Sequence, residues 1–303
     1  MPLAHIDDEL RHPRGTAPWW NESVYLDWTD NDATSGGYLR IGLLPNRNAA
    51  WYWGALVRAG EPTILLIDDE VPLPSRSDGW ELRSDGLWAD YTVESPLEHV
   101  SAGLESFALA IDAPEEVDRS PMLGDRVAFG FELDWFTAGP GVYRWPAVAE
   151  RTEAPCRVEG NVLLGDETMP VDAVGQRDHS WGDREWFAAE WTWTAFHFPD
   201  GRHIHTTTVW LGDAHLSFGY TLADGRYHDV HNAAMDRRTP VRPDGTSLIV
   251  NGESMEIEPV GWAPAPIRDG DRSARLDRAL ARVHHQDGTV GVGWWERHHI
   301  HTG

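Results

Sequence analysis

The fold of this chain is indicated most clearly by the stretch Trp51-Tyr52-Trp53-Gly54-Ala55-Leu56. Side chains of a β-strand alternate between its two faces, so Trp51, Trp53 and Ala55 would face one way and the residues between them the other. Residues 127–136 show a similar alternation. The pattern therefore predicts strands in both places.

Further candidate strands follow along most of the chain, separated by short turn signals. Turns such as Ser84-Asp85-Gly86 and Ala223-Asp224-Gly225 pair Asp with Gly, which suits tight hairpin connections. Many short strands joined by tight turns favour a barrel or a sandwich, because closure of a sheet removes its exposed edges. The other candidate strands are residues 38–44, 63–67, 87–93, 105–111, 157–163, 191–198, 203–210, 215–222, 254–260 and 290–297.

One segment has a different periodicity. Leu276, Leu280 and Val283 recur at helical spacing, so we expect one short peripheral helix over Ser273–Val283. A chain of 303 residues is long enough for two medium domains. We divide it into an N-terminal β domain, residues 1–150, and a C-terminal β domain, residues 151–303. The expected class is all-β, with two antiparallel β-barrels or sandwiches.

Charge and cysteine usage limit the partners and the compartment. The chain has 49 acidic and 25 basic residues, and its net charge of −24 would repel a nucleic acid backbone. The single Cys156 excludes an internal disulfide, and neither a leader pattern nor an apolar run of ~18 residues is found. We expect a cytoplasmic protein without nucleic acid partner or membrane span. The sequence leaves open whether the chain forms a homodimer through its edge strands.

Tryptophan is the unusual component, with 17 residues. Such rings can simply fill β-barrel cores. Several of them stand in pairs two positions apart, however, and such a pair presents both rings on one face of a strand. This spacing favours a cavity lined by indole rings, which would hold an apolar small molecule.

The charged segment Gly175–Trp186 contains the best candidates for chemistry. We interpret it as a loop between two strands, because charged groups are costly in a sheet interior unless they are paired or used. Asp178 beside His179 could serve as a general acid or base, since an apolar pocket raises the pKa of a carboxyl group. Arg177 or Arg184 would oppose that shift. The alternative interpretation is a surface loop of ion pairs.

The run Arg177-Asp178-His179-Ser180-Trp181-Gly182, with Arg184, Trp186 and Trp191-Thr192-Trp193 after it, resembles the carotenoid 1,2-hydratase (hydroxyneurosporene synthase) superfamily. That superfamily is similar to tocopherol cyclase and to the lipocalin-like Diels–Alderases. The resemblance implies two lipocalin-like barrels with a ligand cavity at or near their junction. It also implies protonation of an alkene followed by water addition or ring closure, or a shape-driven cyclisation, with no cofactor and no metal.

Carried over by position, the resemblance makes Asp178 the proton donor and His179 its partner, and Asp183 is the other candidate to orient or recover the proton. Aromatic walls would stabilise developing positive charge through their π faces. The substrate-binding set is Trp181, Arg184, Trp186, Trp191, Trp193 and His197, the last because it shares a strand face with Trp191 and Trp193.

The leading hypothesis is therefore acid-assisted hydration, cyclisation or isomerisation of an apolar, isoprenoid-like small molecule, by an enzyme of the lyase or isomerase class. The alternative is a non-catalytic binding protein or carrier for a hydrophobic small molecule. A third hypothesis is a metal site, because His197, His203 and His205 lie on strands that could be neighbours.

Overall fold

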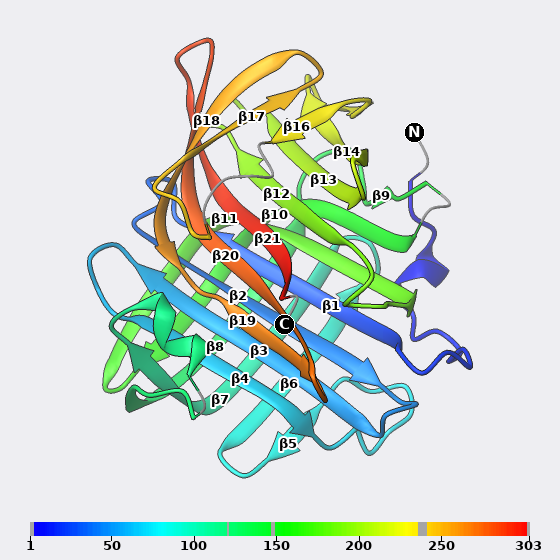
Figure 1. The fold of residues 1–303 in the computed structure, drawn as a ribbon, viewed down its shortest axis with the longest axis vertical. Helices are drawn as coiled ribbons and strands as arrows, with labels where there is room; N and C mark the ends of the chain where they lie inside the picture. Colours follow the sequence, from blue (N-terminus) through cyan, green and yellow to red (C-terminus); the bar gives the residue numbers. More distant parts are fainter. Residues whose placement is uncertain (1–2, 120, 147–148, 236–240, 302–303) are drawn as a thin grey trace.

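The computed structural model describes residues 3–119, 121–146, 149–235 and 241–301. Two large antiparallel sheets make up the molecule, and they lie against each other (Figure 1). The described helical elements are two short 3-10 turns, η1 (Ile6–Glu9) and η2 (Pro114–Asp118). No helix in the described part of the chain is long and apolar enough to cross a membrane. The predicted all-β class is confirmed.

The first sheet contains the strands up to Asp183. Its strand order is β4-β3-β2-β1-β11-β10-β8-β7-β6-β5, β9 pairs with β10, and a further pairing between β4 and β7 curls the sheet into a barrel. The strands are β1 (Trp20–Thr29), β2 (Ser35–Leu44), β3 (Ala49–Arg58), β4 (Thr63–Val71), β5 (Leu82–Ser84), β6 (Leu87–Ser95), β7 (His99–Ile111), β8 (Asp125–Thr137), β9 (Tyr143–Arg144), β10 (Glu150–Leu164) and β11 (Glu167–Asp183).

The second sheet contains the strands from Glu190 onward, in the order β15-β14-β13-β12-β21-β20-β18-β17-β16, with β19 on β20. The strands are β12 (Glu190–His197), β13 (His203–Leu211), β14 (Ala214–Ala223), β15 (Arg226–Asp229), β16 (Ala233–Met235), β17 (Thr246–Val250), β18 (Glu253–Trp262), β19 (Ala265–Asp269), β20 (Arg272–His285) and β21 (Val290–His301).

The chain passes from one sheet to the other between Asp183 and Glu190. Strands β10 and β11, which the division at residue 150 assigns to the second half, pair with the first sheet. The two-domain division itself stays a prediction, because sheet membership does not say which part of the chain folds alone.

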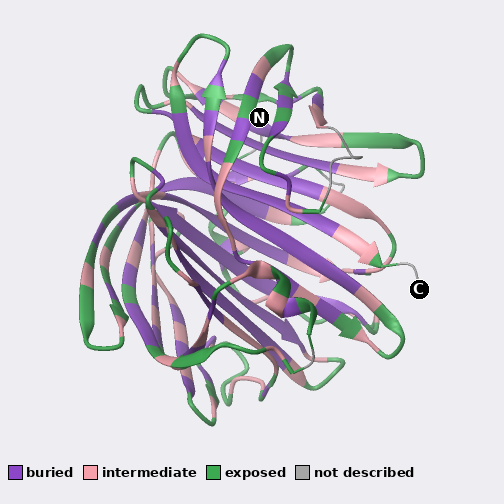
Figure 2. Ribbon diagram, turned by 60° about the vertical axis from the view of Figure 1, so that its left-hand side comes forward, coloured by how far each residue is buried: buried purple, intermediate pink, exposed green. Residues whose placement is uncertain are grey.

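Strand β3 is buried along nearly its whole length, and Figure 2 shows that strands are buried over long stretches whereas the turns that join them are largely exposed. Trp51 and Trp53 pack into the layer between the two sheets, whereas Tyr52 and Leu56 point into the first barrel. Residues that alternate in sequence thus serve two different cores.

The predicted helix over Ser273–Val283 is wrong, because this segment forms strand β20. Leu276 and Leu280 pack between the sheets, and Ala279, Ala281 and Val283 pack into the core of the second sheet. A strand that is buried on both faces loses the polar and apolar alternation. Its apolar residues then occur at spacings that also match a helical stripe.

Candidate active site

Residues 175–183 of the charged segment belong to strand β11 and not to a loop, which corrects the sequence interpretation, whereas residues 184–186 follow the strand. β11 lies in the middle of the first sheet between β1 and β10, and Gln176 to Ser180 are all buried. Gln176 reaches toward the second sheet, where its Nε2 lies 3.1 Å from the Tyr220 hydroxyl. His179 reaches to the opposite face, toward Glu22. Charged residues are accommodated in this strand because partners on both faces pair with them.

A cavity of about 180 Å³ lies between the two sheets. Both sheets and the segments that connect them contribute to it. Its walls are Ser23, Tyr25, Arg40, Trp145, Ala149, Arg151, Asp178, Arg184, Trp186, Trp191, Trp193, Thr207, Val209, Leu276, Arg278 and Glu296.

Asp178 is the carboxyl group that the first sheet supplies to this cavity. Its Oδ2 lies 2.7 Å from Nη2 of Arg151. The pKa of Asp178 is raised to about 6: burial is the largest cause, the nearby Glu153 carboxylate also raises it, and Arg151 and Arg184 oppose the increase. Desolvation therefore outweighs the neighbouring guanidinium groups, and the acid form is accessible near neutral pH.

Glu296 is the carboxyl group on the opposite wall. It forms an ion pair with Arg278 at 2.5 Å and accepts a hydrogen bond from Trp191 Nε1 at 2.8 Å. Burial raises the pKa of Glu296, but Arg278 and the indole N–H outweigh it and hold this pKa below its ordinary value. One cavity thus holds two carboxyl groups whose pKa values are shifted in opposite directions, which is how active sites separate an acid from a base.

A further contact, between His205 and Glu153, lies beside the cavity and is completely buried. His205 Nε2 lies 3.0 Å from Glu153 Oε2, and Glu153 also accepts hydrogen bonds from Gln176 and from Trp193. Arg151 lies 3.6 Å from the other oxygen of Glu153. Because Arg151 also pairs with Asp178, it links the cavity carboxyl to this buried pair.

The predicted site residues separate into two groups. Asp178, Arg184, Trp186, Trp191 and Trp193 meet in the cavity, although they come from β11, from β12 and from the connection between them. The others, His179, Trp181, Asp183 and His197, do not line it.

Trp181 and Asp183 line a neighbouring cleft of about 310 Å³ instead. This cleft shares Ala149, Arg151 and Arg184 with the cavity. Asp183 is exposed at the end of β11. Its side chain is therefore placed on an approach to the cavity and not inside it.

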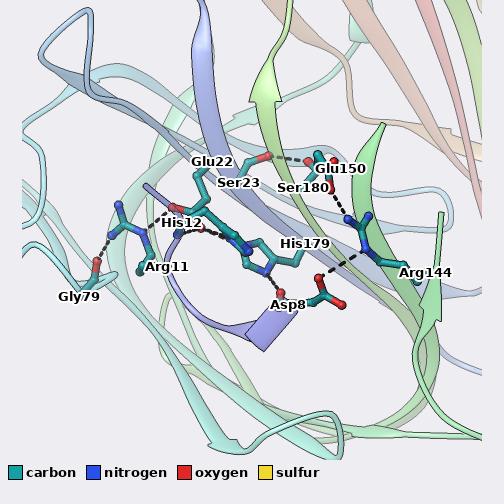
Figure 3. A network of polar contacts seen from close by, with 10 residues as sticks. All are labelled: Asp8, Arg11, His12, Glu22, Ser23, Gly79, Arg144, Glu150, His179 and Ser180. Atoms are coloured by element: carbon teal, nitrogen blue, oxygen red, sulfur yellow. Dashed lines mark hydrogen bonds and ion pairs between the residues drawn. The ribbon is translucent and has the colours of Figure 1, made fainter. Parts of the chain in front are cut away.

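His179 belongs to a separate polar network around the buried Glu22 (Figure 3). Glu22 Oε1 accepts the backbone N–H of His12 at 2.8 Å and lies 2.9 Å from His12 Nδ1 and 3.3 Å from His179 Nε2. Arg11 Nε donates to the other oxygen at 2.7 Å. Burial raises the pKa of Glu22, but these partners together lower it to about 2.

Within the described residues, the group whose possible metal-ligand atoms all lie within 4.8 Å of one another is His12, Glu22 and His179. His179 Nδ1 lies 2.9 Å from the Asp8 carbonyl oxygen and donates to it, because a carbonyl only accepts. Its Nε2 therefore faces Glu22 either as an N–H donor or across a shared cation. Arg11 already neutralises Glu22, so the network is complete without a metal.

The histidines of the metal hypothesis are directed to different partners. His203 Nδ1 lies 3.2 Å from His197 Nδ1, whereas His205 is paired with Glu153. Burial lowers the pKa of both His197 and His203, the former to about 3, so both rings are neutral. The three rings are not gathered within ligand distance of one another in the described part of the chain.

Sequence reasoning missed several residues of the site, namely Tyr25, Arg40, Glu153, Arg278 and Glu296, and it considered His205 only as a possible metal ligand. Two of them left a local signal. Arg40 interrupts the apolar strand 38–44, and Glu296 follows Trp294-Trp295 directly. A charged residue inside an otherwise buried strand is informative because burial of an unpaired charge is costly.

Comparisons with solved structures show what this fold is similar to. Kievitone hydratase from Nectria haematococca superposes with a TM-score of 0.61 at 12% identity, covering 98% of this chain and 93% of that one. CghA in complex with Sch210972 gives 0.62 at 11% identity, with coverages of 94% and 89%. A protein of Nitrosomonas europaea given the name AttH gives 0.60 at 14% identity, with 92% of both chains covered. At these identities the likeness concerns the fold alone.

A search of the curated proteins finds no match. A family model described as a domain of unknown function, DUF7064, matches residues 5–300. The chain belongs to this family. The comparisons with solved structures support the resemblance to a hydratase-like and cyclase-like fold. Membership of the carotenoid 1,2-hydratase superfamily stays a resemblance.

Proposed function

We propose that this member of the DUF7064 family is a cofactor-independent enzyme of the lyase or isomerase class, which adds water to an unsaturated small molecule or closes a ring in it. The observation that carries the proposal is the pair Asp178 and Glu296. They share one cavity, and their pKa values are shifted upward and downward respectively. The fold shared with kievitone hydratase is compatible with a hydration reaction.

In this mechanism Asp178 is the acid. It supplies a proton to one carbon of the substrate's double bond, either before or after water, or a nucleophile within the substrate, forms a bond to the other carbon. Glu296, which is ionised, takes the proton that the nucleophile loses. Exchange with solvent returns Asp178 to the acid form and Glu296 to the carboxylate, so the sum is addition of water or ring closure without oxidation.

The indole walls would set the shape and limit the water. Trp145, Trp186 and Trp193 are buried and Trp191 is partly buried, so few water molecules compete with the substrate inside the cavity. A volume of about 180 Å³ suits a small molecule or one reactive end of a larger one. We propose that the cleft beside Trp181 and Asp183 is the entrance.

The test compares wild type with Asp178→Asn and, as a matched control, with Asp183→Asn. Each protein is incubated with prenyl alcohols, small terpenoids, prenylated phenols and unsaturated polyketides, and each mixture is analysed by liquid chromatography and mass spectrometry. We expect wild type and Asp183→Asn to produce a compound heavier by one water, or an isomer with a new retention time. Equal conversion by Asp178→Asn would overturn the role of Asp178.

A non-catalytic carrier is the second candidate. It is favoured by the position of the cavity between the two sheets, a geometry that suits retention of a ligand as well as its conversion. The same experiment separates the two, because a carrier would bind a compound of the panel, seen as quenching of the cavity tryptophans, and release it unchanged.

A further inference from the structure

The polar wall of the cavity contains more positive than negative groups. Arg151 pairs with Asp178, and Arg278 pairs with Glu296. These two ion pairs use both carboxyl groups that line the cavity. The positive charge of any other guanidinium group on the wall is therefore not paired with a carboxylate of the cavity.

Arg40 and Arg184 are those other groups. Among the described residues neither has an ion pair with a carboxylate: Arg40 Nη2 donates to the Asn21 side-chain oxygen at 3.1 Å, and Arg184 Nη2 to the Ser180 hydroxyl at 3.4 Å. Arg40 is only 2% exposed, and its Nη1 has no hydrogen-bond partner among those residues. Burial of a cation without an ion-pair partner costs free energy, so the presence of Arg40 in this cavity indicates that its charge has a function.

The two guanidinium groups also act on each other. Burial lowers the pKa of Arg40 well below its ordinary value, and Arg184 lowers it further. Burial and the neighbouring Arg151 lower the pKa of Arg184 to about 10, although Asp178 and Glu296 oppose the decrease. An anion placed between Arg40 and Arg184 would compensate both and supply an acceptor for the free Nη1.

The aromatic rings around the cavity are already in contact with cations. The Trp186 ring centroid lies 5.3 Å from the guanidinium carbon of Arg40 and 5.1 Å from that of Arg184. The guanidinium carbon of Arg151 lies 4.9 Å from the Trp145 centroid, and that of Arg278 lies 4.6 Å from the Tyr25 centroid. A carbocation would meet like charges here. The environment instead favours a substrate that carries or develops negative charge.

We propose that Arg40 and Arg184 bind a carboxylate that is conjugated to the double bond of the substrate. This inference rests on the proposed function and specifies its substrate as a small α,β-unsaturated acid with an apolar body. Water would form a bond to the β carbon while Glu296 takes its proton and the π electrons shift toward the carboxylate. Asp178 would then protonate the α carbon, which gives a β-hydroxy acid.

Nonspecific attraction does not explain such binding. The chain has a net charge of −24, so its overall field repels an anion, and the affinity must come from the few groups inside the cavity. We therefore expect added salt to increase the association rate, because it screens the long-range repulsion.

The test uses cinnamate and cinnamamide, which share a skeleton and differ in one charge. Isothermal titration calorimetry is applied to wild type, Arg40→Met, Arg184→Met and the control Arg47→Met, whose guanidinium lies outside the cavity and pairs with Asp269. We expect wild type to bind cinnamate about 10- to 100-fold more tightly than cinnamamide, as charged hydrogen bonds predict. Either cavity variant should lose about tenfold in cinnamate affinity, and the control should lose none.

Thermal unfolding of the ligand-free proteins provides an independent measurement. If Arg40 is kept for a ligand, Arg40→Met should unfold at the same temperature as wild type or a higher one, because an uncompensated charge is removed. A large decrease would assign Arg40 to the fold. Arg184→Met, at a half-buried position, then keeps the binding test decisive.

Failure of this inference can be told from failure of the proposed function. Equal binding of cinnamate and cinnamamide by wild type, or unchanged cinnamate affinity in both cavity variants, would overturn the carboxylate proposal. Conversion of neutral alkenes that depends on Asp178 would leave the proposed function standing in that case. Conversely, arginine-dependent cinnamate binding supports the carboxylate proposal even if no compound of the panel is converted.

Discussion

Buried carboxyl groups at the two faces of strand β11 have pKa values that are shifted in opposite directions. On the face toward the second sheet, Asp178 has a pKa of about 6, raised by burial. On the other face, His179 is directed at Glu22, whose pKa is lowered to about 2 by its partners His12, His179 and Arg11. Both oxygens of Glu22 have hydrogen-bond partners, whereas Asp178 has one guanidinium partner and a cavity in front of it.

This difference shows that adjacent residues of one motif can be assigned different roles by their surroundings. A carboxylate that is fully paired is fixed as an anion and stabilises the fold, while one that is desolvated and partly paired can exchange a proton. We assign the face with Asp178 to chemistry and the face with His179 to attachment of the N-terminal segment, because His179 also donates to the Asp8 carbonyl.

The largest expected effect comes from Asp178→Asn. An amide cannot supply the proton, so kcat/KM for a converted substrate should fall by about 10²–10⁴-fold. The measurement is a steady-state assay, with circular dichroism to confirm that the variant is folded. The comparison of the two faces breaks down if His179→Gln reduces turnover as severely as Asp178→Asn.

Glu22→Gln tests the structural face. Loss of this buried carboxylate should lower the free energy of unfolding by about 3–5 kcal/mol, because Arg11 is left without its counter-charge. Urea denaturation measures this value. The control is Glu150→Gln, an exposed carboxylate paired with Arg144, which should change it by less than about 1 kcal/mol.

The two carboxyl groups also predict opposite pH dependences of stability. The pKa of Glu22 is lowered on folding, so its contribution is complete above its unfolded value of 4.5 and is lost as the pH falls toward about 2. The pKa of Asp178 is raised, so its contribution is present below 3.8 and is lost as the pH rises through about 6. Urea midpoints of wild type, Glu22→Gln and Asp178→Asn between pH 2 and 8 would show the two windows.

The pH profile of turnover sharpens the assignment of the acid. Only protonated Asp178 can donate, so kcat/KM should fall about tenfold for each pH unit above about 6. A profile that is flat from pH 5 to 8 would contradict proton transfer from Asp178.

The smallest effect is expected for Trp181→Phe. Its ring stacks on His12 with centroids 3.6 Å apart and does not line the cavity. We expect kcat/KM within about threefold of wild type, since an aromatic ring is kept. A loss as large as that of Trp193→Phe would show that the cavity extends to this side of β11.

Local periodicity was enough to predict most of the strands. The alternation at Trp51 and Trp53 depends only on the geometry of an extended chain, which is the same in any sheet. It was not enough for β20, where burial on both faces removed the alternation, or for β11, where charged residues are kept inside a sheet by partners on other strands.

For the site, the sequence by itself determined that Trp191 and Trp193 share a face of one strand, because this relation follows from chain geometry. It did not predict that Asp178 and His179 lie on opposite faces of a strand, since Gly175–Trp186 was interpreted as a loop. Only the tertiary structure decided which face of β11 meets the second sheet, and therefore which of the two neighbours enters a cavity with Arg40 and Glu296. The physical reason is that pKa shifts and ion pairs depend on groups that are close in space, and strand pairing, not sequence separation, determines which groups those are.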